Sequence, residues 1–312
     1  MIFDSESVFE ENVITVLKQH GWKDGVLRYP TERDLLDNWK GILYRNNNDI
    51  DRLGKYPLTD GEMTQIIEQI ETLRTPLALN SFVNGRTVSI TRDNKEDVAH
   101  FGKEVSLYIY DRKEIAGGKS TYQIAQQPVY PAKNKMLNSR RGDLVLLING
   151  MPLIHIELKK SGIPVSQATN QIEKYAHEGV FTGLFRLVQI FVAMNPDDAV
   201  YFANPGVDKF NPSYYFHWAD YNNEPICGGQ NPGKDEWKLF IGGTSGTAGL
   251  LSIPMAHQLI GFYTIADSAD GCLKVLRSYQ YIAANAISDV VRKCDWEQRP
   301  ATPGRPGGYV WH

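Results

Sequence analysis

The feature that most constrains the fold is a pair of apolar segments joined by Asn149 and Gly150. Residues 144–148 are apolar throughout, and residues 151–158 are interrupted only by Pro152, His155 and Glu157. An Asn-Gly step between two such segments is a strong signal for a β-hairpin, because both residues tolerate positive φ. A strand that is apolar at every position is typical of burial on both faces of a sheet. We therefore expect a buried hairpin within a mixed sheet.

Charged residues stand at the open end of this hairpin. Asp143 opens the first strand, and Glu157 and Lys159 close the second, with Leu158 pointing to the opposite face. An Asp beside a Glu-x-Lys strand is the pattern of metal-dependent phosphodiester cleavage. In this hypothesis Asp143, Glu157 and the Leu158 carbonyl bind Mg²⁺, which prefers oxygen ligands. Lys159 then orients the attacking water and helps to deprotonate it.

The alternative is structural: Asp143 caps a strand, while Glu157 and Lys159 form a solvated pair. The motif alone occurs often by chance. His155 shares a face with Glu157 by alternation, but it is expected to be a packed or solvated residue because Mg²⁺ prefers oxygen.

The register of the hairpin makes the hypothesis checkable. A regular hairpin with a two-residue turn would pair Asp143 with Ile156 and would leave Glu157 on the opposite face. A shared metal ion therefore requires one extra residue in the second strand or in the turn. We predict either a three-residue turn over residues 149–151 or a β-bulge.

Composition limits where nucleic acid can bind. The net charge of −3 over 312 residues excludes a globally basic binding surface. Any DNA contact must come from a local basic cluster around the hairpin, whose alternative role is a solvated rim. The cluster comprises Lys133, Lys135, Arg140, Arg141, Lys159 and Lys160.

The expected compartment is a reducing cytoplasm. The three cysteines are too few and too widely spaced to suggest a disulfide framework or a zinc site. The first residues lack the features of a signal peptide, and no apolar segment approaches the length of a membrane span.

Helices are predicted on both sides of the hairpin. Residues 5–21 form the first, with Glu6 and Glu10 on one side. These acids are either favoured there by the helix dipole, or one of them reaches the metal site. Capping-box patterns predict helices over 31–45 and 59–74. A helix over 166–177 places Gln171 and Tyr175 on one face, where they either pack or reach the site or a DNA phosphate.

The rest of the chain predicts further strands and helices. Strands are expected over 82–90, 105–110, 122–127, 187–193, 199–203 and, as a short edge strand, 216–218. Helices are expected over 256–266 and 278–294. The glycine-rich stretch 224–249 predicts a long loop or a domain boundary. Residues 228–235 nearly match a phosphate-binding loop, but Asp235 replaces the required hydroxyl and no clear helix is expected after it, so we assign no nucleotide site there.

An ordered set of motifs resembles the R subunit of type I restriction endonucleases (the HsdR family), whose N-terminal region carries a PD-(D/E)xK nuclease and a downstream Q-x-x-x-Y motif. The hairpin segments 149–153 and 156–160 and the segment 171–175 carry most of the resemblance. The other similar segments are 5–10, 191–193, 201–204, 276–280 and 307–312. One departure is Gly142 before the first acid, where the family has Pro or another residue.

The resemblance implies an α/β fold with a restriction-endonuclease-like mixed sheet core flanked by helices, followed by the start of a RecA-like motor. It implies a nuclease domain over 1–225, a connection over 226–265 and the beginning of a helicase-like ATPase over 266–312. The sequence ends before the phosphate loop expected next, which suggests an N-terminal fragment.

The resemblance also assigns roles to residues. Asp143, Glu157 and the Leu158 carbonyl would bind Mg²⁺, with Lys159 catalytic. Glu10, with Glu6 as runner-up, would be the helix carboxylate near the metal. The residues that would support DNA binding or cleavage are Gln171, Tyr175 and Arg141.

The function implied is Mg²⁺-dependent cleavage of double-stranded DNA. In the full-length subunit it would be coupled to ATP-driven translocation, with modification and specificity subunits as partners and S-adenosylmethionine entering through those partners. Two other hypotheses remain: a stand-alone repair or recombination nuclease of the same fold, and an inert assembly platform.

Overall fold

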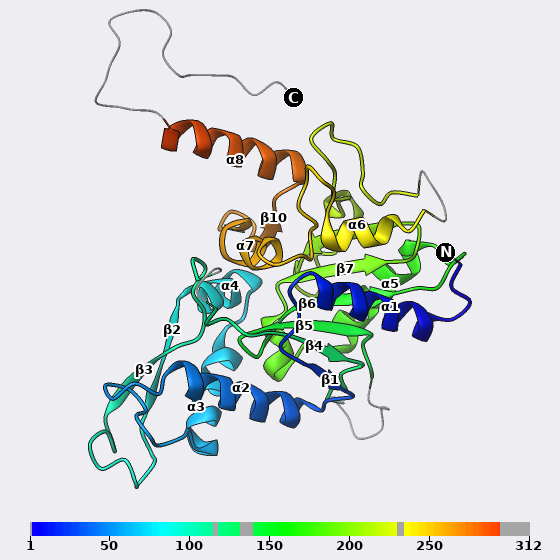
Figure 1. Ribbon diagram of the computed structural model, residues 1–312. Coiled ribbons are helices and arrows are strands. Elements are labelled where there is room, and N and C mark those ends of the chain that lie inside the picture. The colour runs from blue at the N-terminus through cyan, green and yellow to red at the C-terminus, as the bar shows by residue number, and fades with distance from the viewer. Residues whose placement is uncertain (1, 115–117, 132–139, 230–233, 294–312) are drawn as a thin grey trace, which may run out of the picture.

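A six-stranded mixed sheet forms the centre of the protein (Figure 1). The computed structural model describes residues 2–114, 118–131, 140–229 and 234–293. In spatial order the strands are β1 (Val26–Arg28), β4 (Tyr122–Gln126), β5 (Leu144–Ile148), β6 (Met151–Leu158), β7 (Ile190–Met194) and β8 (Ala199–Ala203). The pairs β1–β4 and β6–β7 are parallel, and the other three are antiparallel. The expected mixed α/β sheet is confirmed.

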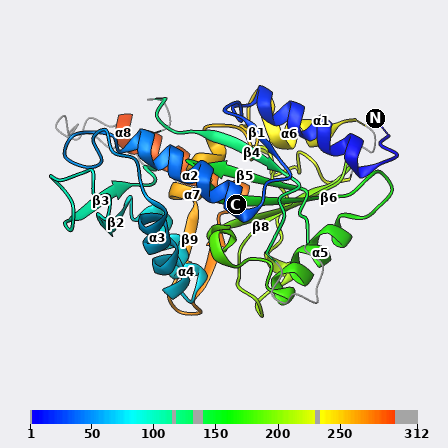
Figure 2. The ribbon, with the colours of Figure 1, turned by 90° about the horizontal axis from the view of Figure 1, so that it is seen from below.

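Helices cover both faces of this sheet. Helices α1 (Glu6–Gln19) and α6 (Glu236–Gly242) lie on one face, and α5 (Val165–Glu178) lies on the other (Figure 2). Helix α5 is the crossover that joins the parallel strands β6 and β7, a connection too long for a simple turn. Its apolar side packs Ala168 and Ile172 against Phe191 of β7. The hairpin is thus enclosed between two helical layers.

The β5–β6 hairpin contains the predicted irregularity. Asn149 (φ 53°) and Gly150 (φ 83°) form a two-residue turn in which both residues have positive φ. The register shifts along β6, because Leu147 pairs with Pro152 but Leu146 pairs with Ile154. Leu153 is therefore the extra residue of a β-bulge, and the prediction of a bulge is confirmed.

The bulge determines which side chains share a face at the open end. Leu144 pairs with Ile156, so Asp143, one residue earlier, stands opposite Glu157, one residue later. Residues directly opposite each other in an antiparallel pair point to the same side of the sheet. Without the extra residue, the two carboxylates would lie on opposite faces.

A helical layer with a small two-stranded sheet flanks the turn of the hairpin. It contains α2 (Glu32–Asn46), α3 (Asp60–Thr72), α4 (Pro76–Asn84) and the antiparallel pair β2 (Thr87–Thr91) and β3 (Glu104–Tyr108). Both predicted capping boxes are present, at Thr31 with Asp34 and at Thr59 with Glu62.

One expectation for this region is wrong in its first part only, because β2 does cover residues 87–90. The predicted strand over 82–90 begins as helix, and the Asn-Gly pair at 84–85 ends α4. The helix is favoured by the cap from Thr75, by Pro76 in its first turn and by burial of Leu79 and Val83 at helical spacing.

The C-terminal part also differs from the prediction. Helix α6 lies within the stretch predicted as a loop, and it follows the near-match to a phosphate-binding loop, part of which lies outside the described residues. Helix α7 (Met255–Phe262) stops earlier than expected, because the following residues form the hairpin of β9 (Thr264–Asp267) and β10 (Cys272–Val275). Residues 216–218 contribute one isolated bridge, between Phe216 and Tyr201, rather than a strand.

Helix α8 (Ser278–Lys293) matches its predicted range closely. Two 3₁₀ turns, Gly183–Leu187 and Pro212–Tyr214, complete the regular structure of the described residues. No helix in the described ranges has the length and apolar character needed to cross a membrane.

We predict that Gly150→Ala destabilises the fold more than Gly162→Ala. The two glycines have φ values of 83° and 81°, so both alanines carry the same backbone strain. A Cβ at Gly150 would lie 2.8 Å from the Trp39 Cα, whereas a Cβ at Gly162 would meet nothing within 4 Å. Overpacking of this kind costs about 1–3 kcal/mol, measurable as a difference between the two variants in urea denaturation. Equal stabilities would contradict the close packing of the turn against α2.

Candidate active site

The structure brings Asp143, Glu157 and Lys159 together at the open end of the hairpin. The Asp143 Oδ2 accepts a hydrogen bond of 2.7 Å from the Leu158 backbone N–H. The Lys159 Nζ lies 3.4 Å from the Glu157 Oε1 and donates a 2.9 Å hydrogen bond to the Leu158 carbonyl. Glu157 is fully buried and Lys159 is 7% exposed, so the solvated-pair alternative does not describe them.

Helix α1 supplies two further acids, which lie in different surroundings. The Glu6 Oε1 is 3.7 Å from the Lys159 Nζ, and its side chain is about half exposed. Glu10 is buried, and its Oε1 accepts hydrogen bonds from the side-chain amides of Gln126 (2.6 Å) and Gln127 (3.3 Å). Glu6 therefore contacts the amine of the cluster, while Glu10 is held by two glutamines at the end of β4.

Gln126 and Gln127 were not predicted as site residues. Gln127 links Glu10 to the acidic cluster, because its side chain bonds to Glu10 while its backbone N–H donates to the Asp143 carbonyl at 2.7 Å. The sequence signal was weak: two adjacent glutamines closing an apolar strand are polar groups that need partners when they are buried.

Burial changes the proton affinity of these acids. It raises the pKa of Asp143 to about 8, and the nearby charge of Glu157 adds to the shift. It raises the pKa of Glu157 to about 7, although Lys159 opposes that shift. Burial also raises the pKa of Glu10, because the hydrogen bonds from the glutamines offset its effect only in part and the charge of Asp143 adds to it. The cluster thus has more buried carboxylates than cations to balance them.

These residues fit a hard divalent cation. Burial raises the pKa values of Asp143 and Glu157, so a cation bound between the two carboxylates would stabilise their ionised forms. No group of three or more His, Cys, Asp or Glu side chains in the described ranges is arranged to hold a metal. The oxygen donors that the sequence hypothesis names are the carboxylates of Asp143 and Glu157 and the Leu158 carbonyl, and that carbonyl accepts a hydrogen bond from the Lys159 Nζ.

His155 is a packed residue, and it extends the site inward. It is fully buried, with its Nδ1 2.9 Å from the Tyr130 hydroxyl and its Nε2 3.4 Å from the Glu157 Oε2. Burial lowers the pKa of His155 to about 4, so the imidazole is neutral at pH 7. Alternation along the strand indicated the shared face with Glu157, but nothing local in the sequence indicated Tyr130.

Gln171 and Tyr175 form a hydrogen-bonded chain to the strand that carries Asp143. The Gln171 amide donates to the Tyr175 hydroxyl at 2.7 Å, and that hydroxyl donates to the Arg141 carbonyl at 2.9 Å. The packing interpretation therefore describes their contacts. The exposed Arg141 guanidinium lies 5.8 Å from the centre of the Tyr29 ring.

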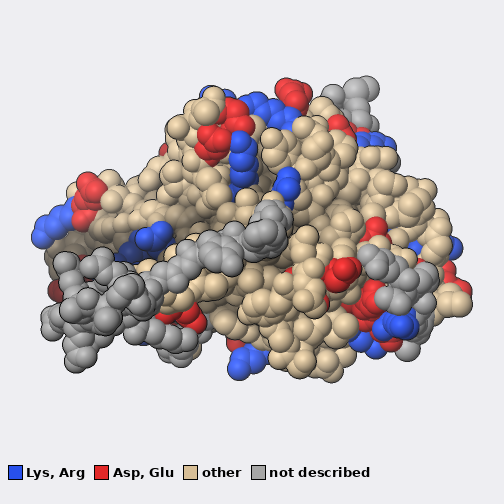
Figure 3. Space-filling model, turned by 90° about the horizontal axis from the view of Figure 1, so that it is seen from above, with Lys and Arg blue, Asp and Glu red and all other residues tan. Residues whose placement is uncertain are grey.

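The remaining basic residues of the predicted cluster are dispersed. Arg140 forms two 2.9 Å hydrogen bonds to Glu178, and the Lys160 Nζ lies 3.4 Å from the Asp4 carbonyl. Lys133 and Lys135 lie outside the described residues. On the face seen in Figure 3, basic and acidic side chains are interspersed rather than gathered into one basic surface.

Gly142 has a steric reason to precede the first acid. A Cβ at this position would lie 2.5 Å from the Tyr130 hydroxyl and 2.9 Å from the His155 Cε1. A proline at this position would clash with Tyr130 and His155, which explains why the chain has glycine here.

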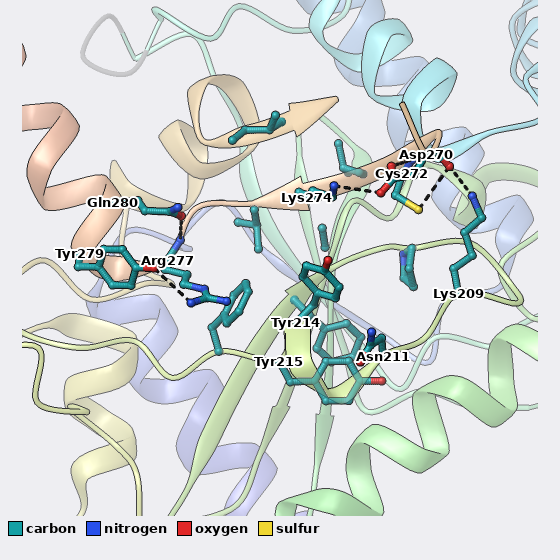
Figure 4. A pocket seen from close by; sticks show the side chains of 17 residues that line it. Lys209, Asn211, Tyr214, Tyr215, Asp270, Cys272, Lys274, Arg277, Tyr279 and Gln280 are labelled. Atoms are coloured by element: carbon teal, nitrogen blue, oxygen red, sulfur yellow. Dashed lines mark hydrogen bonds and ion pairs between the residues drawn. The ribbon is translucent and has the colours of Figure 1, made fainter. Parts of the chain in front are cut away.

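A separate cavity of about 410 Å³ lies between the 205–216 loop, the β9–β10 hairpin and the start of α8 (Figure 4). Its cationic groups already have partners: Lys274 pairs with Asp270 at 2.9 Å, and the Arg277 guanidinium lies 4.6 Å from the centre of the Phe216 ring. None of its lining residues belongs to the acidic cluster, so the cavity and the candidate active site are separate places in the structure.

The fold and the acidic cluster define a mixed α/β protein with an oxygen-donor site at the end of a bulged hairpin. The sequence matches the family described as "Type I restriction enzyme R protein N terminus" over residues 4–210. Because this match covers more than half of the chain, the chain belongs to that family.

Curated relatives carry consistent names. The chain is 28% identical over 320 residues to the type I restriction enzyme SsaAORF53P endonuclease subunit of Staphylococcus saprophyticus, and 29% identical over 314 residues to the SauMSSORF170P endonuclease subunit of Staphylococcus aureus. In both cases the match includes 100% of this chain but only 29% of the relative. The type I restriction enzyme EcoprrI endonuclease subunit of Escherichia coli is 26% identical, over 99% of this chain and 90% of the relative.

We predict that Asp143→Asn stabilises the metal-free protein at high pH. The folded-state pKa values of Asp143 (about 8) and Glu157 (about 7) lie above their ordinary values. The folded state then holds more protons than the unfolded state between about pH 4 and 8, and stability falls as pH rises through that window. The asparagine side chain carries no charge and keeps an oxygen for the Leu158 N–H. The free energy of unfolding at pH 8 should rise by an amount on the order of 1–2 kcal/mol relative to the wild type, and it should change little at pH 4.

Urea denaturation in EDTA at both pH values measures this difference. Asp34→Asn is the contrasting control, because bonds from Thr31 lower the pKa of that carboxyl group. That variant should lose stability at pH 8. If the free energy of unfolding of Asp143→Asn depended on pH in the same way as that of the wild type, the raised pKa of the buried Asp143 would be contradicted.

Proposed function

We propose that this chain is the DNA-cleaving region of a type I restriction R subunit, with a PD-(D/E)xK site formed by Asp143, Glu157 and Lys159. The observation that carries the proposal is the bulge at Leu153, which puts both carboxylates on one face beside the amine. A structural salt bridge at a strand end needs no such shift in register. Two acids and an amine on one face at a strand end match the pattern of metal-dependent phosphodiester cleavage.

Each residue has a chemical role in this proposal. Asp143, Glu157 and the Leu158 carbonyl would hold Mg²⁺, which would polarise the scissile phosphate and lower the pKa of water. Lys159 lies against Glu157 and orients the attacking water. Its ammonium group also stabilises the charge that develops on the phosphate oxygens.

The surrounding residues support the reaction. Glu10 is the proposed helix carboxylate near the metal, because it is buried and Gln127 links it to the Asp143 carbonyl. Glu6 instead contacts Lys159. Tyr175, oriented by Gln171, fixes the Arg141 carbonyl, which leaves the Arg141 guanidinium exposed beside the site for contact with a DNA phosphate.

The wider assembly is also part of the proposal. The staphylococcal relatives are more than three times as long as this chain. In such a subunit, residues 1–225 would be the nuclease domain, 226–265 a connection and 266–312 the start of a RecA-like, ATP-binding motor. Residues 294–312 of that segment lie outside the described residues. The complex would add modification and specificity subunits, with S-adenosylmethionine bound through them, and would act on double-stranded DNA in the cytoplasm.

We predict that Lys159→Ala in the complete R subunit, reconstituted with its modification and specificity subunits, lowers DNA cleavage by about 100-fold or more. Lys160→Ala is the matched control, because the adjacent amine lies against the Asp4 carbonyl at 3.4 Å, and it should cleave at nearly the wild-type rate. ATP hydrolysis should be unaffected in both. Cleavage is measured by linearisation of a circular DNA that carries one recognition site.

The outcomes separate the competing functions. Undiminished cleavage by Lys159→Ala would indicate an inert platform instead of a nuclease. Rapid cleavage by the chain without ATP or partners would indicate a stand-alone nuclease.

Metal removal gives an independent prediction. EDTA should abolish cleavage by the reconstituted complex, and excess Mg²⁺ should restore it. Asp143→Ala should remain inactive at all Mg²⁺ concentrations, because it lacks a ligand rather than the ion. Activity that persists in EDTA would contradict the proposed chemistry.

A further inference from the structure

Two buried polar atoms next to the acidic cluster face each other. The His155 Nε2 and the Glu157 Oε2 are 3.4 Å apart, and neither has another hydrogen-bond partner among the described residues. The second oxygen of the same carboxylate, Oε1, lies 3.4 Å from the Lys159 Nζ. Buried polar groups are rarely left unpaired in folded proteins, so the imidazole is the natural partner of the inner oxygen.

Tyr130 contacts the other nitrogen of the His155 ring, and one direction of that hydrogen bond places the ring hydrogen on Nε2. Its hydroxyl lies 2.9 Å from the Nδ1. When that hydroxyl donates to Nδ1, the hydrogen of the neutral ring is on Nε2 and points at the Glu157 Oε2. The opposite tautomer would place the Nε2 lone pair against a carboxylate oxygen in a fully buried position, which is repulsive.

The imidazole is also held in place by packing. Phe181 and Phe191 meet it edge-on, with ring centroids at 5.5 Å and 6.0 Å, and Tyr175 lies at 6.3 Å. Gly142 also packs closely against the ring, because a Cβ at this position would lie 2.9 Å from the His155 Cε1. The ring therefore cannot turn away from Glu157 without repacking its neighbours.

We propose that His155, oriented by Tyr130, is a positioning residue that holds one oxygen of Glu157 and leaves the other to face the metal and Lys159. The proposal rests on the proposed nuclease site and goes beyond it, because it assigns a role to two residues outside the motif. Groups that orient a metal ligand typically change metal affinity by about 10–100-fold when they are removed. Loss of the His155 N–H should therefore weaken metal binding without removing a ligand.

The test measures Mn²⁺ binding to the full chain by electron paramagnetic resonance, with a thermal melt for each variant. His155→Phe keeps a buried ring but removes the N–H, and it should weaken Mn²⁺ binding by about 10-fold or more. His155→Gln places an amide N–H near the former Nε2, and it should recover most of the affinity. Tyr130→Phe, which removes a single hydroxyl, should weaken binding by a smaller factor, and it carries the test should His155→Phe fail to fold.

His257→Phe is the matched control. His257 is also fully buried, with a tyrosine hydroxyl (Tyr122) 2.9 Å from its Nδ1, but its Nε2 contacts the Asp111 carbonyl. This variant should lose stability and keep its Mn²⁺ affinity, which separates positioning from general destabilisation.

Two negative results have different meanings. If the wild type binds no Mn²⁺, or if Asp143→Ala binds Mn²⁺ as well as the wild type does, the proposed metal site is wrong. The positioning role of His155 is then wrong too. If the wild type shows such binding, but folded His155→Phe and Tyr130→Phe bind Mn²⁺ as tightly as the wild type, the positioning role alone is overturned.

Discussion

The one extra residue in strand β6 is the constraint on which the site depends. Two apolar strands joined by a two-residue turn would place Asp143 and Glu157 on opposite faces of the sheet. The bulge at Leu153 reverses this for every residue beyond it. The strands are buried on both faces between α1 and α5, so the register cannot slip back without exposing one apolar face. The same burial that stabilises the hairpin therefore fixes the relative position of the two acids.

The cost of this arrangement appears as altered proton affinity. Burial raises the pKa values of both Asp143 and Glu157, and the nearby charge of Glu157 raises that of Asp143 further. Polar groups from four elements surround them: Glu6 and Glu10 from α1, the glutamines that end β4, Lys159 after β6, and the α5 tyrosine that fixes the Arg141 carbonyl. A site that is unfavourable without a cation and well ordered by its neighbours is suited to binding one.

Local sequence patterns predicted most of the scaffold and placed Asp143, Glu157 and Lys159 at the same end of the hairpin. The Asn-Gly turn, the two capping boxes and helices α1 and α5 all follow from spacing within a few residues. The bulge was one of two alternatives that the hypothesis of a shared metal required, and the other, a three-residue turn, is not present. Helix α4 was missed because residues 82–90 were predicted as a strand, although Thr75 and Pro76 signal a helix start. The partners Gln126, Gln127 and Tyr130 could not be predicted, because they reach Glu10 and His155 through contacts between segments far apart in the chain.

The most direct measurement is anomalous diffraction from crystals of this chain soaked in Mn²⁺. The proposed site predicts an anomalous peak between the Asp143 and Glu157 carboxylates. No peak there at saturating Mn²⁺, or a peak bound by only one of the two acids, would contradict the claim that the bulged hairpin forms a single metal-binding site.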